Sequence, residues 1–204
     1  MTADDLSEVV ALHREKFPTN IASRFGRRFT RRYLEMFMSS RSATCLVATR
    51  RDAVVGYLVG VLRTDEHQRH LRSRLPRLAL AALPGAVWNL SFTVRVVVRR
   101  ISLRLARATT AEQSSAPSGP VAVLSHIAVA EPAQRRGLGG RLVATFEHTA
   151  ERRGAQTAML ATLDHDAHVG RFYERRGWEL HDLVTTADGR RLRIYRVPMG
   201  EAAA

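Results

Sequence analysis

The first forty residues carry inward-facing side chains at the spacing of α-helices. One such stripe runs through residues 4–17, and Pro18 ends the helix that it predicts. A second helix is predicted at about 26–39, because aromatic residues share one side and arginines fill much of the other. The inward-facing positions are Leu6, Val9, Val10, Leu12 and His13 in the first helix, and Phe29, Tyr33, Met36 and Phe37 in the second.

The next segments have the pattern of a β-hairpin. Thr44–Thr49 is rich in β-forming residues, residues 50–52 are typical of a turn, and Val54–Leu62 is a long apolar strand. Gly56 and Gly60 within that strand indicate a bulge or a close approach of another part of the chain.

Helices and strands alternate in the last third of the chain, which predicts an α/β fold around a mixed sheet. The predicted strands are Val121–Val129, Thr157–Leu163, Trp178–Val184 and Leu192–Val197, and the predicted helices are Gly139–Arg153 and Ala167–Arg176. A chain of 204 residues suits a single domain, 1–204.

Residues 66–107 differ from the rest in composition. They contain nine arginines and one acid, Glu66, and so supply +8 of the formal net charge of +13. Apolar residues at helical spacing predict two basic amphipathic helices here, although Phe92–Val98 also alternates as a strand would. Residues 108–120 are small, polar and Pro/Gly-rich, and are predicted to form a flexible linker.

The charge favours an anionic partner, but the aromatic pattern argues against nucleic acid. Trp88 and Phe92 both precede the arginine cluster, whereas single-stranded nucleic acid is bound by interleaved aromatic and basic residues. The acidic N-terminus has no apolar signal core, and no run approaches the roughly 18 apolar residues of a spanning helix, so we expect a cytoplasmic protein. A lone Cys45 excludes an intramolecular disulfide and a cysteine metal cluster; we expect it to be buried rather than catalytic.

A glycine-rich turn follows the strand at Val121–Val129 and opens a helix. Free N–H groups at a helix start bind anions, and Gly137, Gly139 and Gly140 let a phosphate approach the backbone. The alternative is a plain strand–turn–helix with glycines for packing. The turn lacks the Gly-Lys-Ser/Thr ending of a P-loop and the third glycine of the dinucleotide fingerprint.

Gln134–Gly140 resembles the Q/R-x-x-G-x-G/A signature of the GCN5-related N-acetyltransferase (GNAT) superfamily. The strand end Ile127–Val129 is also similar, and Arg171–Trp178 resembles the family's F-Y-x-x-x-G-F/W element. The resemblance covers residues 121–197 well and 4–62 loosely, and it implies the acyl-CoA N-acyltransferase fold. That fold has a mixed, mostly antiparallel central sheet flanked by helices, and here we expect a helical insertion at 66–107.

The resemblance implies direct transfer of an acyl group from acetyl-CoA, or a longer acyl-CoA, to an amine of a small molecule in a ternary complex. Backbone groups of the strand end would bond the acyl carbonyl and the pantetheine, and those of the loop would hold the pyrophosphate. Asp166 stands where relatives carry an Asn that contacts the cofactor. The expected cofactor-binding residues are Ile127, Ala128, Val129, Gln134, Arg135, Arg136, Gly137, Leu138, Gly139, Gly140 and Asp166.

Two residues are candidates for proton transfer. Tyr173 matches the tyrosine that protonates the leaving thiolate in many relatives; otherwise it is a core aromatic. The two central strands hold no carboxylate, so His126 is the candidate base, with an ordinary pKa of about 6.5. The alternative is that His126 is a packed residue and that a chain of water molecules removes the proton of the amine. His165 and His168 lack a third ligand at sensible spacing, so no metal is expected.

Three further expectations concern the rest of the chain. The insertion 66–107 is predicted to recognise substrate, with its apolar faces covered by the protein core, by an acyl chain or acyl carrier protein, or by a membrane surface. Relatives usually begin with a short strand, for which Met1–Ala3 leaves no room, so that strand is missing or lies upstream. The rival function is a non-catalytic acyl-CoA-binding or basic adaptor module of the same fold.

Overall fold

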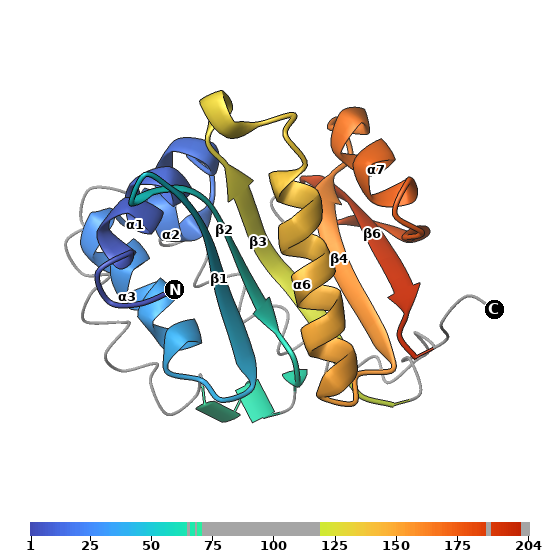
Figure 1. Ribbon diagram of the computed structural model, residues 1–204. Coiled ribbons are helices and arrows are strands. Elements are labelled where there is room, and N and C mark those ends of the chain that lie inside the picture. The colour runs from blue at the N-terminus through green and yellow to red at the C-terminus, as the bar shows by residue number, and fades with distance from the viewer. Residues whose placement is uncertain (65, 68, 71–118, 187–188, 201–204) are drawn as a thin grey trace.

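The computed structural model describes residues 1–64, 66, 67, 69, 70, 119–186 and 189–200 (Figure 1). The described elements are α1 (Leu6–Lys16), α2 (Ile21–Arg24), α3 (Arg27–Met38), β1 (Ala43–Arg50), β2 (Ala53–Val61), β3 (Val121–Val129), the 3-10 helix η1 (Glu131–Ala133), α6 (Leu138–Arg152), β4 (Thr157–Leu163), α7 (Ala167–Glu174), β5 (Glu179–Thr185) and β6 (Arg191–Pro198). The helices and strands predicted within these ranges are therefore confirmed to within a few residues. Most of the predicted insertion 66–107 and linker 108–120 lies outside the described residues.

Two local features refine the predicted N-terminal half. The short helix α2 was not predicted; it is capped by Asn20, whose side chain accepts a hydrogen bond from Ala22 N at 2.9 Å. The β1–β2 turn is two residues long and places Arg51 and Asp52 at positive φ, as the hairpin turns that match the twist of paired strands require.

The described strands form a six-stranded sheet in the order β1-β2-β3-β4-β6-β5 (Figure 1). Neighbouring strands run antiparallel except β3 and β4, which are parallel and are joined through α6. The predicted mixed, mostly antiparallel sheet is thus confirmed.

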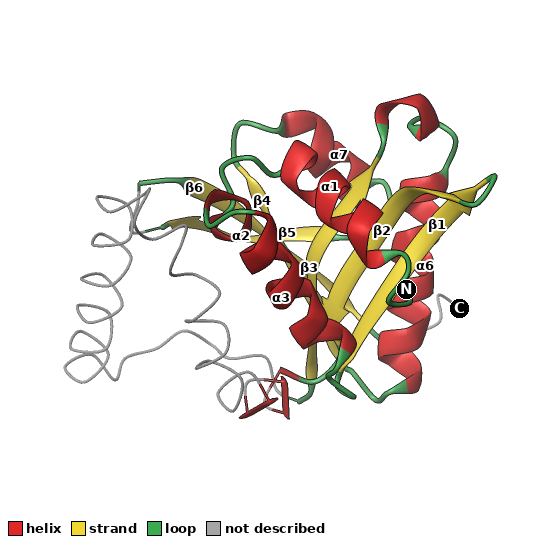
Figure 2. Cartoon of the chain, turned by 90° about the vertical axis from the view of Figure 1, so that its left-hand side faces the viewer, coloured by secondary structure: helices red, strands yellow, loops and turns green. Residues whose placement is uncertain are grey.

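Helices cover both faces of this sheet, and each face has its own apolar core (Figure 2). On one face α6 and α7 pack over a core that includes Phe146, Tyr173 and Trp178. On the other face α1 and α3 pack over a core that includes Leu34 and Tyr57. Side chains that alternate along β3 therefore enter two different environments. None of the described helices has the length and apolar character needed to cross a membrane.

Gly60 marks both a close approach and a bulge, as its position in the strand predicted. A Cβ at Gly60 would lie 2.4 Å from the buried Phe146 ring of α6. The β2–β3 register shifts at the same level, because Val59 pairs with His126 but Gly60 pairs with Leu124. Ser125 is the extra residue in β3, so the strand changes direction just before His126.

The sheet opens between β3 and β4 beyond this bulge. Residues Val121–Leu124 of β3 pair with residues Thr157–Leu160 of β4. Both strands continue beyond these residues without pairing to each other. The remaining residues of β3 therefore keep one backbone edge free of β4. This opening lies at the same end of β3 as the glycine-rich turn (Figure 1).

Candidate functional site

The glycine-rich turn connects β3 to α6 through two left-handed residues. Arg135 and Gly137 have φ values of 56° and 75°, and Gly137 caps α6 without any side-chain hydrogen bond. The first N–H groups of a helix have no acceptor within the helix. Together with the positive end of the helix dipole, they make the α6 N-terminus suited to an anion.

Gln134 ties this turn to the end of β3. Its side-chain Nε2 donates a hydrogen bond to Val129 O at 2.9 Å, and its backbone N–H donates to Glu131 O at 3.1 Å. Gln134 therefore positions the turn through its own side chain rather than offering that side chain to a ligand.

The backbone edge at Ile127 and Val129 faces the opening between β3 and β4. Ala130 N donates a hydrogen bond to Val55 O of β2 at 2.9 Å, so the backbone groups of Ala130 face β2. Backbone groups alternate along a strand, so Ala128 also faces β2 while Ile127 and Val129 face away from it. Of the three strand-end residues predicted from the sequence, two present backbone groups to the opening, and Ala128 does not.

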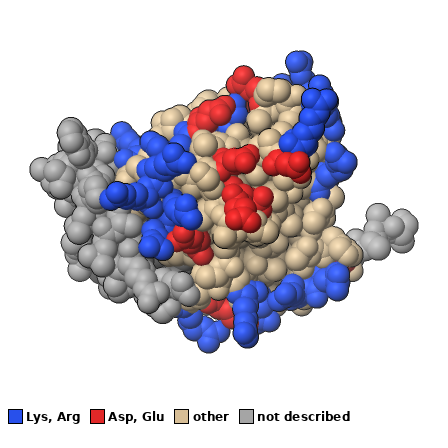
Figure 3. Space-filling view, turned by 60° about the vertical axis from the view of Figure 1, so that its left-hand side comes forward, with Lys and Arg blue, Asp and Glu red and all other residues tan. Residues whose placement is uncertain are grey.

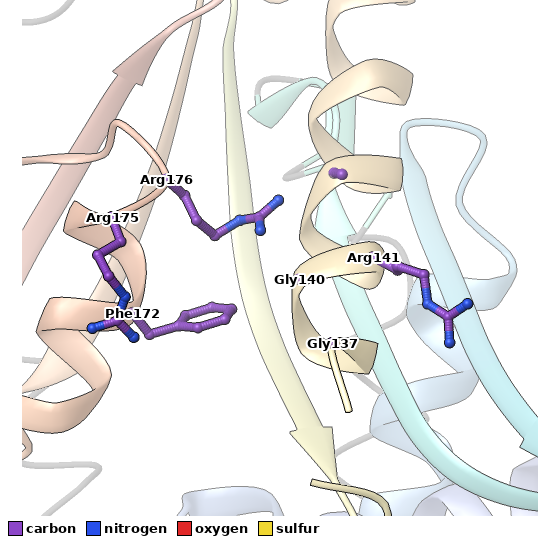
Figure 4. A pocket seen from close by; sticks show the side chains of 7 residues that line it. Gly137, Gly140, Arg141, Phe172, Arg175 and Arg176 are labelled. Atoms are coloured by element: carbon purple, nitrogen blue, oxygen red, sulfur yellow. The ribbon is translucent and has the colours of Figure 1, made fainter. Parts of the chain in front are cut away.

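A hollow of about 620 Å³ lies between α6 and α7 beside the turn (Figure 4). Phe172 and Arg176 extend from the α7 side toward α6, whereas Arg141 leaves α6 in another direction (Figure 4). The lining residues are Gly137, Gly140, Arg141, Ala144, Phe172, Arg175 and Arg176. The arginines of this hollow are thus not the predicted Arg135 and Arg136, which are exposed.

Arg176 is the basic side chain held most firmly at this hollow. Its guanidinium carbon lies 5.8 Å from the Phe172 ring centroid, and its Nη2 lies 4.0 Å from Glu147 Oε2. Its Nε is buried and has no hydrogen-bond partner in the described part of the chain. A Cβ at Gly140 would meet Arg176 Nη1 at 2.8 Å, so the glycine leaves room for the guanidinium.

Tyr173 lies in the core on the α6 and α7 side of the sheet. It is 3% exposed and contacts Phe172, Trp178 and Tyr195 at ring-centroid distances of 5.0, 5.7 and 6.2 Å. Burial raises the pKa of the phenol well above its usual value, so it stays protonated at neutral pH. No described residue hydrogen-bonds its hydroxyl, which leaves a proton available to a ligand.

His126 lies on the opposite face of the sheet, against α1 and α3. Its Nε2 is 2.7 Å from the Tyr33 hydroxyl, and its ring meets the His13 ring edge to face at 5.0 Å. Burial, and then the neighbouring His13, lower the pKa of His126 to about 3. The ordinary pKa of 6.5 expected from the sequence is therefore wrong: this imidazole is neutral at physiological pH.

The other candidate residues lie outside these contacts. Asp166 is exposed at the start of α7 and makes no capping hydrogen bond. Burial raises the pKa of the Cys45 thiol to about 11, which opposes a role as a nucleophile. The described residues include no group of three side chains suited to a metal ion. On the face shown in Figure 3, acidic side chains gather near the centre, and basic side chains form separate groups around the edge.

Comparison with known proteins finds one family model that matches part of the chain and many solved structures with the same fold. The model of the acetyltransferase (GNAT) family matches residues 96–178, which include the glycine-rich turn and Tyr173. A comparison with curated protein sequences finds no match for this chain.

Many solved structures share the fold. An aminoglycoside 6'-N-acetyltransferase complexed with coenzyme A has a TM-score of 0.60 at 13% identity, with 100% of this chain and 95% of that chain covered. The ribosomal-protein-alanine N-acetyltransferase of Brucella melitensis also has a TM-score of 0.60, at 15% identity, with 98% and 97% covered. NAA60 of Arabidopsis thaliana, solved with acetyl-CoA, has a TM-score of 0.60 at 12% identity, with 97% and 95% covered. The sheet order and the turn at α6 agree with these structures, so the chain has the fold of the GCN5-related N-acetyltransferases, and the model of that family matches residues 96–178.

Proposed function

We propose that this protein transfers an acetyl group, or a longer acyl group, from acyl-CoA to an amine of a small molecule. The observation that carries the proposal is the turn at Gly137, which presents free amides at the α6 N-terminus beside an arginine-lined hollow. The likeness to an aminoglycoside acetyltransferase with bound coenzyme A supports a small-molecule amine as acceptor, and the equal likeness to a ribosomal-protein-alanine N-acetyltransferase makes a protein amine the alternative. We propose the cytoplasm as its place of action.

The described residues fit the chemistry of acyl-CoA. Amides of the turn would hold the pyrophosphate, and Arg176 has the charge and the unpartnered Nε to meet a further phosphate or the adenine face. The free backbone edge at Ile127 and Val129 would bond the pantetheine amides as an added strand. The carbonyl of Val129 already accepts from Gln134, so its N–H and the groups of Ile127 are the ones available.

The two faces of the sheet would divide the reaction between them. Tyr173, on the α6 and α7 face, would donate its proton to the sulfur of the departing thiolate. His126, on the α1 and α3 face, would take the proton that the attacking amine must lose as its nitrogen bonds to the acyl carbon. Pairing between β3 and β4 ends at Leu124 and Leu160, so acyl group and amine would meet beyond that point, between the two strands. Recognition by segment 66–107 stays a prediction.

The matched variants Tyr173→Phe and Tyr195→Phe test the catalytic part. Both tyrosines are buried in the same core, but the Tyr195 hydroxyl donates to Glu174 Oε1 at 3.0 Å whereas the Tyr173 hydroxyl has no described partner. Tyr173→Phe should keep its stability and its affinity for acetyl-CoA while kcat falls by about 10²–10⁴-fold. Tyr195→Phe should lose about 1 kcal/mol of stability and keep its turnover.

A screen of amines, read by thiol release from acetyl-CoA, supplies the substrate for these assays. Calorimetry with acetyl-CoA is run beside it. Binding without turnover on any small-molecule or peptide amine would favour the non-catalytic acyl-CoA-binding module. Turnover of Tyr173→Phe within a factor of about two of the wild type would remove Tyr173 from the mechanism.

A further inference from the structure

Four side chains from four elements meet on the α1 and α3 face of the sheet. His13 of α1 pairs with Tyr57 of β2, with Nδ1 and the hydroxyl 2.6 Å apart. His126 of β3 pairs with Tyr33 of α3, with Nε2 and the hydroxyl 2.7 Å apart. The two imidazoles meet at right angles, with an interplanar angle of 88°. Sequence reasoning singled out His126 alone, because the four residues are far apart in the chain.

The surroundings of His126 oppose a lasting positive charge on its ring. The ring centroids of Phe17 and Tyr33 lie 5.6 Å from that of His126 and the centroid of His13 lies 5.0 Å away, so these rings exclude much of the water that would solvate a charge. No described carboxylate pairs with either imidazole. Burial lowers the pKa of His13 to about 4 and that of His126 to about 3. A base that had to store the proton as an imidazolium would work poorly here.

A neutral imidazole can still move a proton if it accepts at one nitrogen while it releases at the other. We propose that Tyr33 is a positioning residue that holds His126 as its Nε2–H tautomer and receives that proton as Nδ1 takes one from the acceptor amine. This inference rests on the proposed function, because the expected ligand is an amine, which brings N–H donors and so requires a bare nitrogen to meet them.

The proton balance closes without an imidazolium. The amine N–H bond breaks and Nδ1–H forms, while Nε2–H breaks and a new O–H bond forms on Tyr33. The original Tyr33 proton passes to water, which the half-buried position of Tyr33 permits. Once the product has left, water returns the tautomer by the reverse exchange. No oxidant, metal or further co-reactant is required.

The second pair, His13 and Tyr57, is chemically similar but has no route to solvent. Both side chains are 0% exposed, and His13 Nε2 is buried with no described hydrogen-bond partner. Tyr33 and His126 are each half-buried. Tyr33 and His126 are the more exposed pair, so we expect proton exchange with water through them, whereas His13 contacts the ring of His126 by packing. Tyr57→Phe is therefore a matched control for Tyr33→Phe.

The first measurement is the tautomer of His126 by nitrogen-15 NMR of the histidine rings at pH 7, assigned with a His126→Gln variant. The proposal requires protonated Nε2 and bare Nδ1 in the wild type. Tyr33→Phe should shift His126 toward a mixture of tautomers, whereas Tyr57→Phe should leave it unchanged. A wild-type ring protonated at Nδ1, or a tautomer indifferent to Tyr33→Phe, overturns the proposal. This readout needs no turnover, so it stands apart from failure of the proposed function.

The second measurement is turnover with an amine found by the thiol-release screen. Tyr33→Phe should lower kcat by about 10- to 100-fold, less than the loss typical of removing a whole general base. Acetyl-CoA affinity should stay within about twofold. Adding His126→Gln to Tyr33→Phe should cost less than the product of the two separate losses, because the residues act as a unit. An equal loss of kcat in Tyr57→Phe and Tyr33→Phe would mean that both tyrosines act only through packing, and it would overturn the proposal.

Discussion

The two ends of α6 offer a matched test of the proposal that the glycine-rich turn binds phosphate. Gly137 precedes α6 and Gly154 follows it, with φ values of 75° and 76°, and a Cβ at either position meets no atom within 4 Å. Both Gly→Ala variants therefore carry the same backbone penalty, about 1 kcal/mol for a left-handed alanine. For a chain of this size that penalty lowers Tm by roughly 2–4 °C.

Only Gly137 lies where a phosphate would approach the α6 amides. A methyl group there should block one charge-assisted hydrogen bond, which is worth about 1.5–3 kcal/mol. That loss corresponds to a Kd for acetyl-CoA raised by roughly 10- to 100-fold. Gly154 lies beyond the far end of a 15-residue helix, about 25 Å away, so Gly154→Ala should bind as the wild type does.

Calorimetric titration with acetyl-CoA, beside thermal unfolding of both variants, checks the prediction. Equal loss of Tm with a loss of affinity confined to Gly137→Ala is the expected pattern. Wild-type affinity in a folded Gly137→Ala protein would refute the assignment of the turn. Equal weakening in both variants would mean that the effect comes from general destabilisation.

Two further predictions concern stability. Gly60→Ala should lower the free energy of unfolding by about 1–3 kcal/mol in urea titrations, because its Cβ would lie 2.4 Å from the buried Phe146 ring; an unchanged value would mean that the ring moves aside freely. Stability should also fall as the pH drops from 6.5 toward 4, by up to roughly 1.4 kcal/mol per pH unit for each histidine. In this range His13 and His126 become protonated in the unfolded chain but stay neutral in the folded protein, because burial lowers their pKa values to about 4 and 3. Urea unfolding at pH 7.5 and 5 measures the fall, and His13→Asn should reduce it; a pH-independent free energy would contradict the burial argument.

Local sequence was enough to locate the strand-to-helix turn. Helical and strand periodicities differ, so the ends of β3 and of α6 could be placed to within a residue or two. The glycines of the turn were informative because left-handed backbone at Gly137 and close packing at Gly60 each exclude a side chain for a local steric reason.

The charges around the turn could not be assigned in the same way. Arg135 and Arg136 are expected at the anion site because they belong to the turn itself, and that expectation stays a prediction, whereas the hollow beside the turn is lined by Arg141, Arg175 and Arg176. Arg141 lies one helical turn after Gly137, and Arg176 lies within the second family motif, Arg171–Trp178. The sequence therefore provided a reason to consider both residues for the site. What brings Arg176 to the hollow is the packing of α7 against α6, which no local pattern encodes.

The sequence by itself determined the order of the strands and of the longer helices, the glycine-rich turn, and which tyrosine and histidine we propose for proton transfer. The tertiary structure decided that Tyr173 and His126 lie on opposite faces of the sheet, and that Tyr33 holds His126. It also decided the protonation state of His126, since a pKa depends on burial and on neighbours contributed by α1 and α3. The physical reason is the same in each case: periodicity and steric demands act over a few residues, whereas solvent exclusion and hydrogen-bond partners are set by elements that meet only in the folded chain.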